Sequence, residues 1–496
     1  MNSRLPEAKA VLRLFGLLFS ERWIGQWQKR QQQCISPSAL AAKALKARGQ
    51  PKAHPEPRSA GQWRPRFYKR IFCLRVTLWF LLFQRLSFDT SLAGVVRSLR
   101  NGEADGLRRR GRKLSRQVKS NSTSAYNQAR QRLPLELVLE ALAQLSRWIV
   151  QLVGCAQGSR SKPPMHKRVR QLLDGSTLAL LTTPALRRAF RPARGQTDWS
   201  LMRIVVGFCA RSGAVLSAVE GAIRQSEQRL TWGLMAAAAP FIIWIGDRNF
   251  GVWSVVAQAK RYHQDVVVRM TRARANKLAG GRPLVSGEDR LVDWSPSRRD
   301  QGAQGTKRTA IAGRLIYVRL KRDGRWIDLW LFTTLSAEEA SLQLLVQWYG
   351  QRWQAELHFR SLKTQMRLSQ LDVCTPEMAR KEFYIALLAH SLVRAVQWAA
   401  GERLESGLQI LSFNNTRRVL LDWLENWGRH LAAGAGAIDS WVKTLLAEVA
   451  QQRLPKRKKP RRSQIRMVRR RASKWPILKG SRAAAQKRLK TKPNSL

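Results

Sequence analysis

Acidic residues are scarce in this chain. Its 496 residues include 32 Asp and Glu against 90 Lys and Arg, a formal net charge of +58. Repulsion of that size destabilises a compact fold unless a polyanion neutralises it. Nucleic acid is the expected partner, because each phosphate contact releases condensed counterions. The positive charge is spread along the whole chain rather than confined to one amphipathic helix, which argues against a membrane-surface protein.

Cysteine and histidine are also sparse, and neither is clustered. The six histidines are dispersed, and the odd number of cysteines contains no C-x-x-C pair, so no zinc-finger spacing is present. We therefore expect reduced thiols in a cytosolic protein. The five cysteines are Cys34, Cys73, Cys155, Cys209 and Cys374.

Long apolar runs are missing as well. The segment V-T-L-W-F-L-L-F at 76–83 is flanked by Arg75 and Arg85 and is far too short to span a bilayer. Charged residues interrupt the first apolar segment, so no signal peptide is expected. These features predict a soluble cytoplasmic protein without a membrane partner.

What is present is enough apolar sequence for a globular core. Hydrophobic residues make up 44% of the chain, and its length allows two or three domains. The residues from 453 onward carry 18 Lys and Arg and no acid, a composition typical of a disordered tail. The patterns divide the chain into an N-terminal helix (1–35), a Pro-bearing linker (36–65), a helical DNA-binding region (66–160), the first part of a core (161–270), a β-rich insertion (271–335), the second part of the core (336–400), C-terminal helices (401–452) and a basic tail (453–496).

A polar segment in the helical region is a candidate for DNA contact. In S-N-S-T-S-A-Y-N-Q-A-R-Q-R-L at 120–133, the Ser/Thr cluster can cap a short helix. That helix would present Asn127, Gln128, Arg130 and Arg132, and it could enter a DNA groove. A solvated polar helix within a bundle is an equally good interpretation.

The pattern changes to strands after the S-K-P-P break at 161. Two strands joined by the R-S-G turn predict a hairpin, and F-I-I-W-I-G-D is an apolar run typical of a buried strand. The expected elements are a strand that ends at Asp174, the hairpin strands at 201–210 and 213–223, a helix near 226–235, a strand that ends at Asp247, a helix at 251–262 and a strand at 265–270. This order is that of a ribonuclease-H-like fold, an α/β core with a mixed sheet flanked by helices, here interrupted by the β-rich insertion and bounded by helical N-terminal and C-terminal regions.

Two aspartates, Asp174 and Asp247, lie at the ends of apolar strands, where charged side chains are unusual. Asp174 and Asp247 each follow an apolar strand, and the first and fourth strands of such a sheet are neighbours, so the two side chains could meet. Two-metal phosphoryl chemistry needs two or three converging carboxylates, and hard divalent cations prefer oxygen ligands. Either residue alone could instead be a turn former or a helix cap.

A third carboxylate lies in Y-G-Q-R-W-Q-A-E-L-H-F-R-S-L-K at 349–363. On a regular helix, Tyr349, Arg352, Glu356 and Lys363 would fall within about 60° of arc. An ordinary surface helix separates its apolar stripe from its charges, so a shared stripe indicates a site.

Other residues near this stretch are assigned no site role. His358 would point away from the stripe, and we expect it to be packed or solvated rather than a ligand. The S-A-E-E sequence at 336–339 predicts a capping box that opens the helix. Asp198, Glu220, Asp265 and Asp293 lack the convergence of the three carboxylates and are left out.

The spacing Tyr349-x2-Arg352-x3-Glu356-x6-Lys363 resembles the Y-R-E-K signature of one branch of bacterial insertion-sequence DDE transposases. D-G-S-T at 174 and G-D-R-N-F-G at 246 are similar to the surroundings of that family's first two catalytic Asp residues. The resemblance covers about 165–400, is weaker over the N-terminal 160 residues, and is absent for the basic tail.

The resemblance implies a cut-and-paste transposase. Asp174, Asp247 and Glu356 would bind two Mg²⁺ ions, or Mn²⁺ in their place, and the site would nick the element's end and join its 3′-hydroxyl to target DNA. Tyr349, Arg352 and Lys363 would hold phosphates, consistent with the suitability of Arg and Lys for such contacts. The family further implies a homodimer in a paired-end complex on double-stranded DNA, in the cytoplasm at the bacterial nucleoid.

Many members of this branch pass through a DNA hairpin, which requires a displaced base held by an aromatic side chain. Trp294, Trp326, Trp330 and Trp353 are the candidates, and the sequence does not choose among them. Two other interpretations of the chain stay open: a catalytically silent DNA-binding descendant of a transposase, and a ribonuclease-H-like nuclease without strand transfer.

Overall fold

The computed structural model describes residues 20, 22–31, 71–107, 112–156, 161–191, 200–298, 300, 308–322, 324–401, 410–430 and 435–455, with five further residues between 481 and 487. The chain divides into two compact units, 1–454 and 455–496, and the architecture below is that of the first. The predicted linker, Cys34 and nearly all of the basic tail lie outside the described residues. Of the first predicted helix, residues 22–31 are described, and they are helical.

The central sheet has the predicted strand order at its core. β1 lies between an antiparallel neighbour, β2, and a parallel one, β4, while β3 extends the β2 side and β5 the β4 side. This arrangement is the ribonuclease-H-like fold expected from the sequence, with the β2–β3 hairpin confirmed. The strands are β1 (Arg170–Leu180), β2 (Leu201–Cys209), β3 (Val215–Ala222), β4 (Ile243–Gly246) and β5 (Asp265–Arg269).

The strands of the insertion do not form a separate sheet. β8 pairs antiparallel with β5, and β7 and β6 continue outward, so the core sheet is extended by one three-stranded meander. The short β9 pairs in parallel with the end of β1. The added elements are α11 (Arg272–Leu278), β6 (Glu288–Trp294), β7 (Ile311–Arg322), β8 (Arg325–Thr333) and β9 (Gln370–Leu371).

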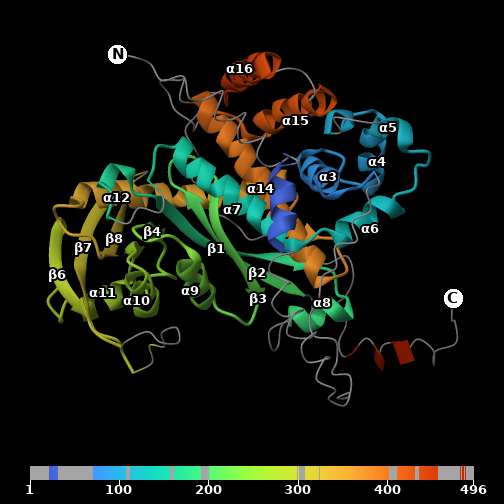
Figure 1. Cartoon of the computed structure of the whole chain (residues 1–496). Helices are drawn as coiled ribbons and strands as arrows, with labels where there is room; N and C mark the ends of the chain where they lie inside the picture. Colours follow the sequence, from blue (N-terminus) through green and yellow to red (C-terminus); the bar gives the residue numbers. More distant parts are fainter. Residues whose placement is uncertain are drawn as a thin grey trace, which may run out of the picture. The chain divides into compact units, whose positions relative to one another are not determined.

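Helices cover both faces of this sheet, as Figure 1 shows. Alternate side chains along each strand point to opposite faces, and each face has its own apolar core. The α14 core includes Leu172 and Ile245 together with helices α7 (Leu135–Leu152) and α14 (Pro376–Gly401). The α10 core includes Leu173 and Trp244 together with helices α9 (Glu227–Ala237) and α10 (Trp253–Arg261).

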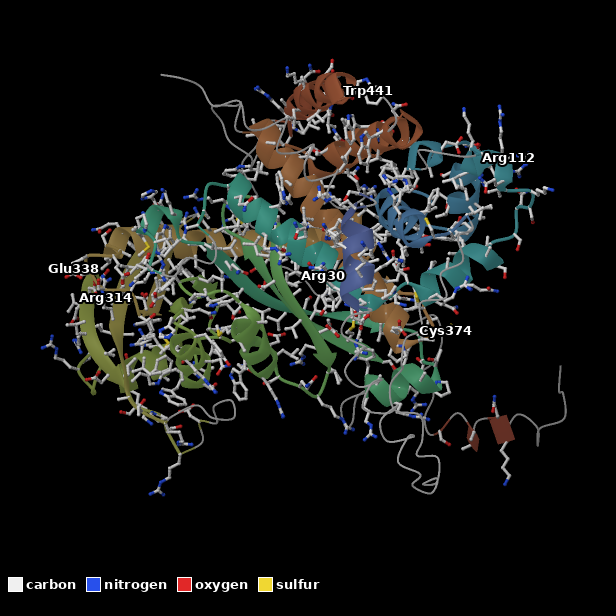
Figure 2. The ribbon with its side chains drawn as sticks, viewed as in Figure 1. Arg30, Arg112, Arg314, Glu338, Cys374 and Trp441 are labelled. Carbon is white, nitrogen blue, oxygen red and sulfur yellow. The ribbon has the colours of Figure 1, made fainter. Side chains whose placement is uncertain are left out.

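The segment before the candidate site is anchored by one buried cation. Arg314 of β7 is 3% exposed, and it donates hydrogen bonds to the carbonyl oxygens of Leu335, Ser336 and Ala340 at 3.3, 2.7 and 2.7 Å. It also pairs with Asp289 of β6. Figure 2 shows Arg314 close to Glu338 of the same turn. The guanidinium therefore fixes the turn from which the next helix starts.

That helix is less regular than predicted. The S-A-E-E capping box forms, with reciprocal bonds between Ser336 and Glu339 of 3.3 and 3.1 Å. It closes only a turn, however, and the helix begins at Leu342 with Ser341 as its cap. The helical run is α12 (Leu342–Gly350), a 3₁₀ turn (Gln351–Trp353), α13 (Gln354–Arg360) and a π turn (Ser361–Gln365). The prediction of one regular helical face is therefore wrong, because 3₁₀ and π turns change the angle per residue.

The remaining helices lie on the α14 side. They are α3 (Leu74–Leu86), α4 (Leu92–Arg100), α5 (Leu114–Gln117), α6 (Ser124–Arg132), α15 (Phe413–His430) and α16 (Ala435–Gln451), with a short α8 (Pro184–Ala189) between β1 and β2 that was not predicted. α14 is long and apolar enough to span a membrane, yet 89% of its apolar window is buried inside the protein, as in the core helix of a soluble fold. The four cysteines in the described part of the chain are free.

The predicted DNA-reading helix is present as α6, but one of its four candidate residues is wrong. Arg130 is 8% exposed and donates to Glu382 of α14 at 2.8 Å, while Arg85 of α3 pairs with the same carboxylate. Arg130 thus holds the helices together and cannot reach a groove. Gln128 and Arg132 are exposed and Asn127 is half-buried, so DNA contact by these three stays a prediction.

Candidate active site

The two predicted aspartates lie side by side on adjacent strands. β1 and β4 are parallel, with Leu173 level with Gly246, so Asp174 and Asp247 are each the next residue along. Asp174 lies two residues after Leu172, and Asp247 two residues after Ile245, and both of these apolar side chains belong to the α14 core. Alternation therefore directs both carboxylates to the same face of the sheet, the face that carries α14.

The prediction that the first strand ends at Asp174 is wrong. β1 continues through D-G-S-T to Leu180, because β2 pairs with it along its length, including Asp174 opposite Val206. On the other side of β1, β4 pairs only up to Leu173 and β9 only from Ala179. Asp174 thus sits at the start of a stretch of β1 that has no strand partner on that side, and α13 contacts β1.

The third carboxylate comes from α13. Glu356 accepts a hydrogen bond of 2.6 Å from Arg352, and its side chain is 60% exposed. Burial raises the pKa of Asp174 to about 6; the Gly175 amide and Arg352 oppose this, and the charges of Asp247 and Glu356 add to it. The structure therefore brings Asp247 and Glu356 within electrostatic reach of Asp174.

Of the other residues on the predicted stripe, Arg352 and Tyr349 lie near the carboxylates, whereas no described interaction places Lys363 there. Tyr349 forms a hydrogen bond with Arg269 at the end of β5, and burial raises its pKa, as does the nearby charge of Asp247, while Arg352 and Arg269 act in the opposite sense. Lys363 lies in the π turn, and burial lowers the pKa of its ammonium group. None of the described interactions joins Lys363 to the three carboxylates, so its place at the site stays a prediction.

One carboxylate that the sequence reasoning missed lies beside these residues. Glu227, the first residue of α9, accepts a 2.6 Å hydrogen bond from Asn249 in the turn that follows Asp247. Burial raises its pKa, Arg203 opposes this, and Asp247 adds to it. No sequence signal pointed to Glu227, because Gly175, which inside a strand often marks the close approach of another group, was predicted to follow the strand and not to lie within it.

His358 behaves as expected for a residue without a ligand role. It is 5% exposed, packs against Phe208 and His390, and its Nδ1 lies 3.0 Å from Arg394 Nη2. Two of the acidic residues left out of the site are also in structural pairs. Asp265 accepts from Arg168, and Glu220 from Arg380.

The carboxylates suit a hard divalent cation in charge and donor type. In their present side-chain positions they do not converge, since Glu356 is bonded to Arg352. Among the described residues, no three His, Cys, Asp or Glu side chains are arranged to hold a metal ion. Asp174 and Asp247 thus suit a divalent cation as two of its ligands. Glu356 would have to release Arg352 to become the third ligand.

The four candidate tryptophans are in different surroundings. Trp294 is 7% exposed and packs edge-on against Phe332, so it belongs to the core and is excluded as a base trap. Trp330 and Trp353 are half-buried, and Trp330 stacks on Tyr317 at 5.1 Å. Trp326 is 59% exposed.

Comparison with known proteins bears on the region that holds these residues. Residues 166–392 match the family model described as "Transposase DDE domain", which supports a DDE transposase family. No curated protein matches the chain. Among solved structures, the chain is similar to the piggyBac transposase of a cryo-EM synaptic complex with hairpin DNA, at a TM-score of 0.40 and 12% identity, over 92% of this chain and 88% of that one.

Proposed function

We propose, with the transposase DDE domain at 166–392 as the premise, that this chain is a cut-and-paste transposase of the Y-R-E-K branch of bacterial insertion sequences. In this proposal it acts at the bacterial nucleoid as a homodimer on double-stranded DNA. It cleaves the ends of its element and joins them to target DNA. The observation that carries the proposal is the shared register of Asp174 and Asp247 on adjacent parallel strands, with Glu356 within electrostatic reach.

The residues have distinct roles in this proposal. Asp174 and Asp247 would hold a divalent ion from one face of the sheet, and Glu356, which is now bonded to Arg352, would be the third ligand. Two Mg²⁺ ions, or Mn²⁺ in their place, would supply an activated nucleophile and stabilise the leaving oxygen. Arg352, once released, is placed beside the carboxylates to contact a DNA phosphate, and Tyr349 and Lys363 are assigned the same task.

The geometry of the insertion supports a hairpin intermediate. β8 pairs with β5 only as far as Leu331 opposite Arg269, and its earlier residues run on past the end of β5. Since β4 and β5 are parallel and level there, this is also the end of the sheet at which Asp247 lies. Trp326, five residues before Leu331, is therefore about 17 Å further out at that end of the sheet, at roughly 3.4 Å per residue, and alternation places it on the α10 face together with Trp330.

Trp326 also has the surroundings of a nucleic-acid contact. Arg319 and Lys321 of β7 lie 5.4 and 5.9 Å from its ring centroid. An exposed aromatic ring with two cations near it can stack on a base while the cations contact phosphates. We propose Trp326 as the residue that holds the displaced base.

The test is cleavage of a labelled duplex that carries the end of the element encoding this chain, with Mg²⁺, by the wild type and by Glu356→Gln. The amide keeps the shape of the side chain and loses its charge. We expect the wild type to cut and to join strands, and the variant to bind the same DNA without doing either.

Other outcomes identify the alternatives. Binding without cleavage by the wild type would mean a catalytically silent DNA-binding descendant. Cleavage without joined products would mean a ribonuclease-H-like nuclease. A shift of the cleaved end to a covalently closed hairpin, read on a denaturing gel, tests the intermediate, and Trp326→Ala should reduce that product while Trp353→Ala serves as its matched control.

A further inference from the structure

The carboxylate of Glu227 occupies the space that a side chain at position 175 would need. A Cβ atom built on Gly175 would lie 2.3 Å from the carboxyl carbon of Glu227 and 2.5 Å from each of its oxygens. Cβ atoms in proteins do not come this close to atoms to which they are not bonded, so any side chain at 175 requires Glu227 to move. The glycine that follows Asp174 is thus a seat for this carboxylate.

From that seat, Glu227 holds the turn that carries Asp247. Its Oε2 accepts 2.6 Å from Asn249 Nδ2, and the backbone N–H of Asn249 donates to Asp247 Oδ1 at 2.9 Å. The neighbouring Gln228 donates to the side-chain and backbone oxygens of Asn249 at 2.7 and 3.0 Å. The start of α9 therefore fixes Asn249 from two sides, and Asn249 fixes the carboxylate of Asp247.

Glu227 lies on the opposite face of β1 from Asp174. Gly175 is the residue between Asp174 and Ser176, and alternation directs its Cβ position to the α10 side, whereas Asp174 points to the α14 side. The side chain of Glu227 approaches from α9, which packs on that α10 side. It therefore reaches the site through Asn249 and not as a ligand.

We propose that Glu227 is a positioning residue for Asp247, acting through Asn249, and that Gly175 is required to seat it. The proposal rests on the proposed function for its effect on DNA cleavage. Its geometric part stands without that function. Outer-sphere partners of this kind orient carboxylate ligands and typically change metal affinity or activity about 10- to 100-fold.

The geometric part is tested by a double-mutant cycle in thermal unfolding. Gly175→Ala should lower Tm by roughly 1–3 °C, because the added methyl group displaces the Glu227 carboxylate from its bond with Asn249. In the Glu227→Ala background the same substitution should cost far less, since the space is free. Gly233→Ala, in α9 with no atom within 4 Å of the added Cβ, is the matched control and should not lower Tm. If Gly175→Ala lowers Tm equally in both backgrounds, Glu227 does not occupy the space beside Gly175 and this part of the proposal is refuted.

The positioning role is tested by cleavage at limiting Mg²⁺. Glu227→Ala should lose about 10-fold or more and need a higher Mg²⁺ concentration for half-maximal rate. Asn249→Ala should do the same, and the two losses should not add, because they break one connection. Glu227→Gln should retain activity within about threefold, since its amide oxygen still accepts from Asn249.

The outcomes separate the two proposals. If the wild type cuts but Glu227→Gln is as defective as Glu227→Ala, the charge of Glu227 matters rather than its hydrogen bond, and the positioning role is refuted. If the wild type does not cut at all, the proposed function fails, and the unfolding cycle still decides whether Gly175 seats Glu227.

Discussion

Acid should destabilise this protein through two buried imidazoles. His390 is fully buried, and neither of its ring nitrogens has a hydrogen-bond partner; the same holds for Nε2 of His358. Burial lowers the pKa of both well below the ordinary 6.5, and the buried Arg394 lowers it further in each case, with a contribution from His390 at His358. Phe208 and Phe413 supply the other neighbouring rings and carry no charge.

The sign follows from proton uptake. Below pH 6.5 the unfolded chain protonates both histidines, while the folded protein keeps them neutral, so stability is complete above that pH and is lost as the pH falls. For one histidine the loss between pH 7.5 and 5.5 is RT ln 10, about 1.4 kcal/mol. The pair should therefore cost about 2.7 kcal/mol over that interval.

The assay is urea unfolding at pH 7.5 and 5.5 for the wild type and His390→Phe. The phenyl ring keeps the stack on Phe413 and removes one titrating group, so the variant should lose about 1.4 kcal/mol less than the wild type between the two pH values. His166→Gln, at an exposed position, is the matched control and should leave the difference unchanged. A pH dependence of His390→Phe equal to that of the wild type would falsify the reasoning.

Four further substitutions have expected effects on stability. Glu382→Ala should lower the free energy of unfolding in urea by about 3–5 kcal/mol, because it leaves two buried guanidinium groups without their carboxylate. A loss under 1 kcal/mol would show that these ion pairs do not stabilise the fold. Arg314→Lys should lower Tm, since an ammonium group cannot reach three carbonyls and Asp289 from one position, and an unchanged Tm would mean that the turn is held otherwise. Trp294→Ala should lower the free energy of unfolding by about 3–5 kcal/mol, and Trp326→Ala by at most about 0.5 kcal/mol, because only the first ring is buried. Equal losses for the two variants would contradict this difference in burial.

The core of the fold could be predicted from local patterns. Alternating apolar residues and the R-S-G turn were enough for the hairpin, and the apolar run before Asp247 was enough for β4, because each pattern reports burial of a short segment. The neighbouring positions of Asp174 and Asp247 followed from strand order alone. Their roles, and that of Glu356, stay predictions until cleavage is measured.

What could not be predicted depends on distant partners. β1 runs through D-G-S-T, a sequence typical of a turn, because β2 supplies pairing there. Arg130 was expected at a groove, yet its partner Glu382 is 252 residues further along the chain. Glu227 carried no motif of its own, since only its contact with Gly175 and Asn249 marks it.

The packing of α14 has a consequence for synthesis of the protein on the ribosome. Its side chains complete the apolar core shared with α3 and α7, although it begins more than 200 residues after α7 ends. At about 5–20 residues per second, translation from the end of α7 to the end of α14 takes roughly 12–50 s. During that interval the face of α7 that packs on α14 stays uncovered, although β3 is already available to cover another part of the helix. Nascent chains that stop before residue 401 should therefore be clients of chaperones and proteases, and only chains translated past that point can complete this core.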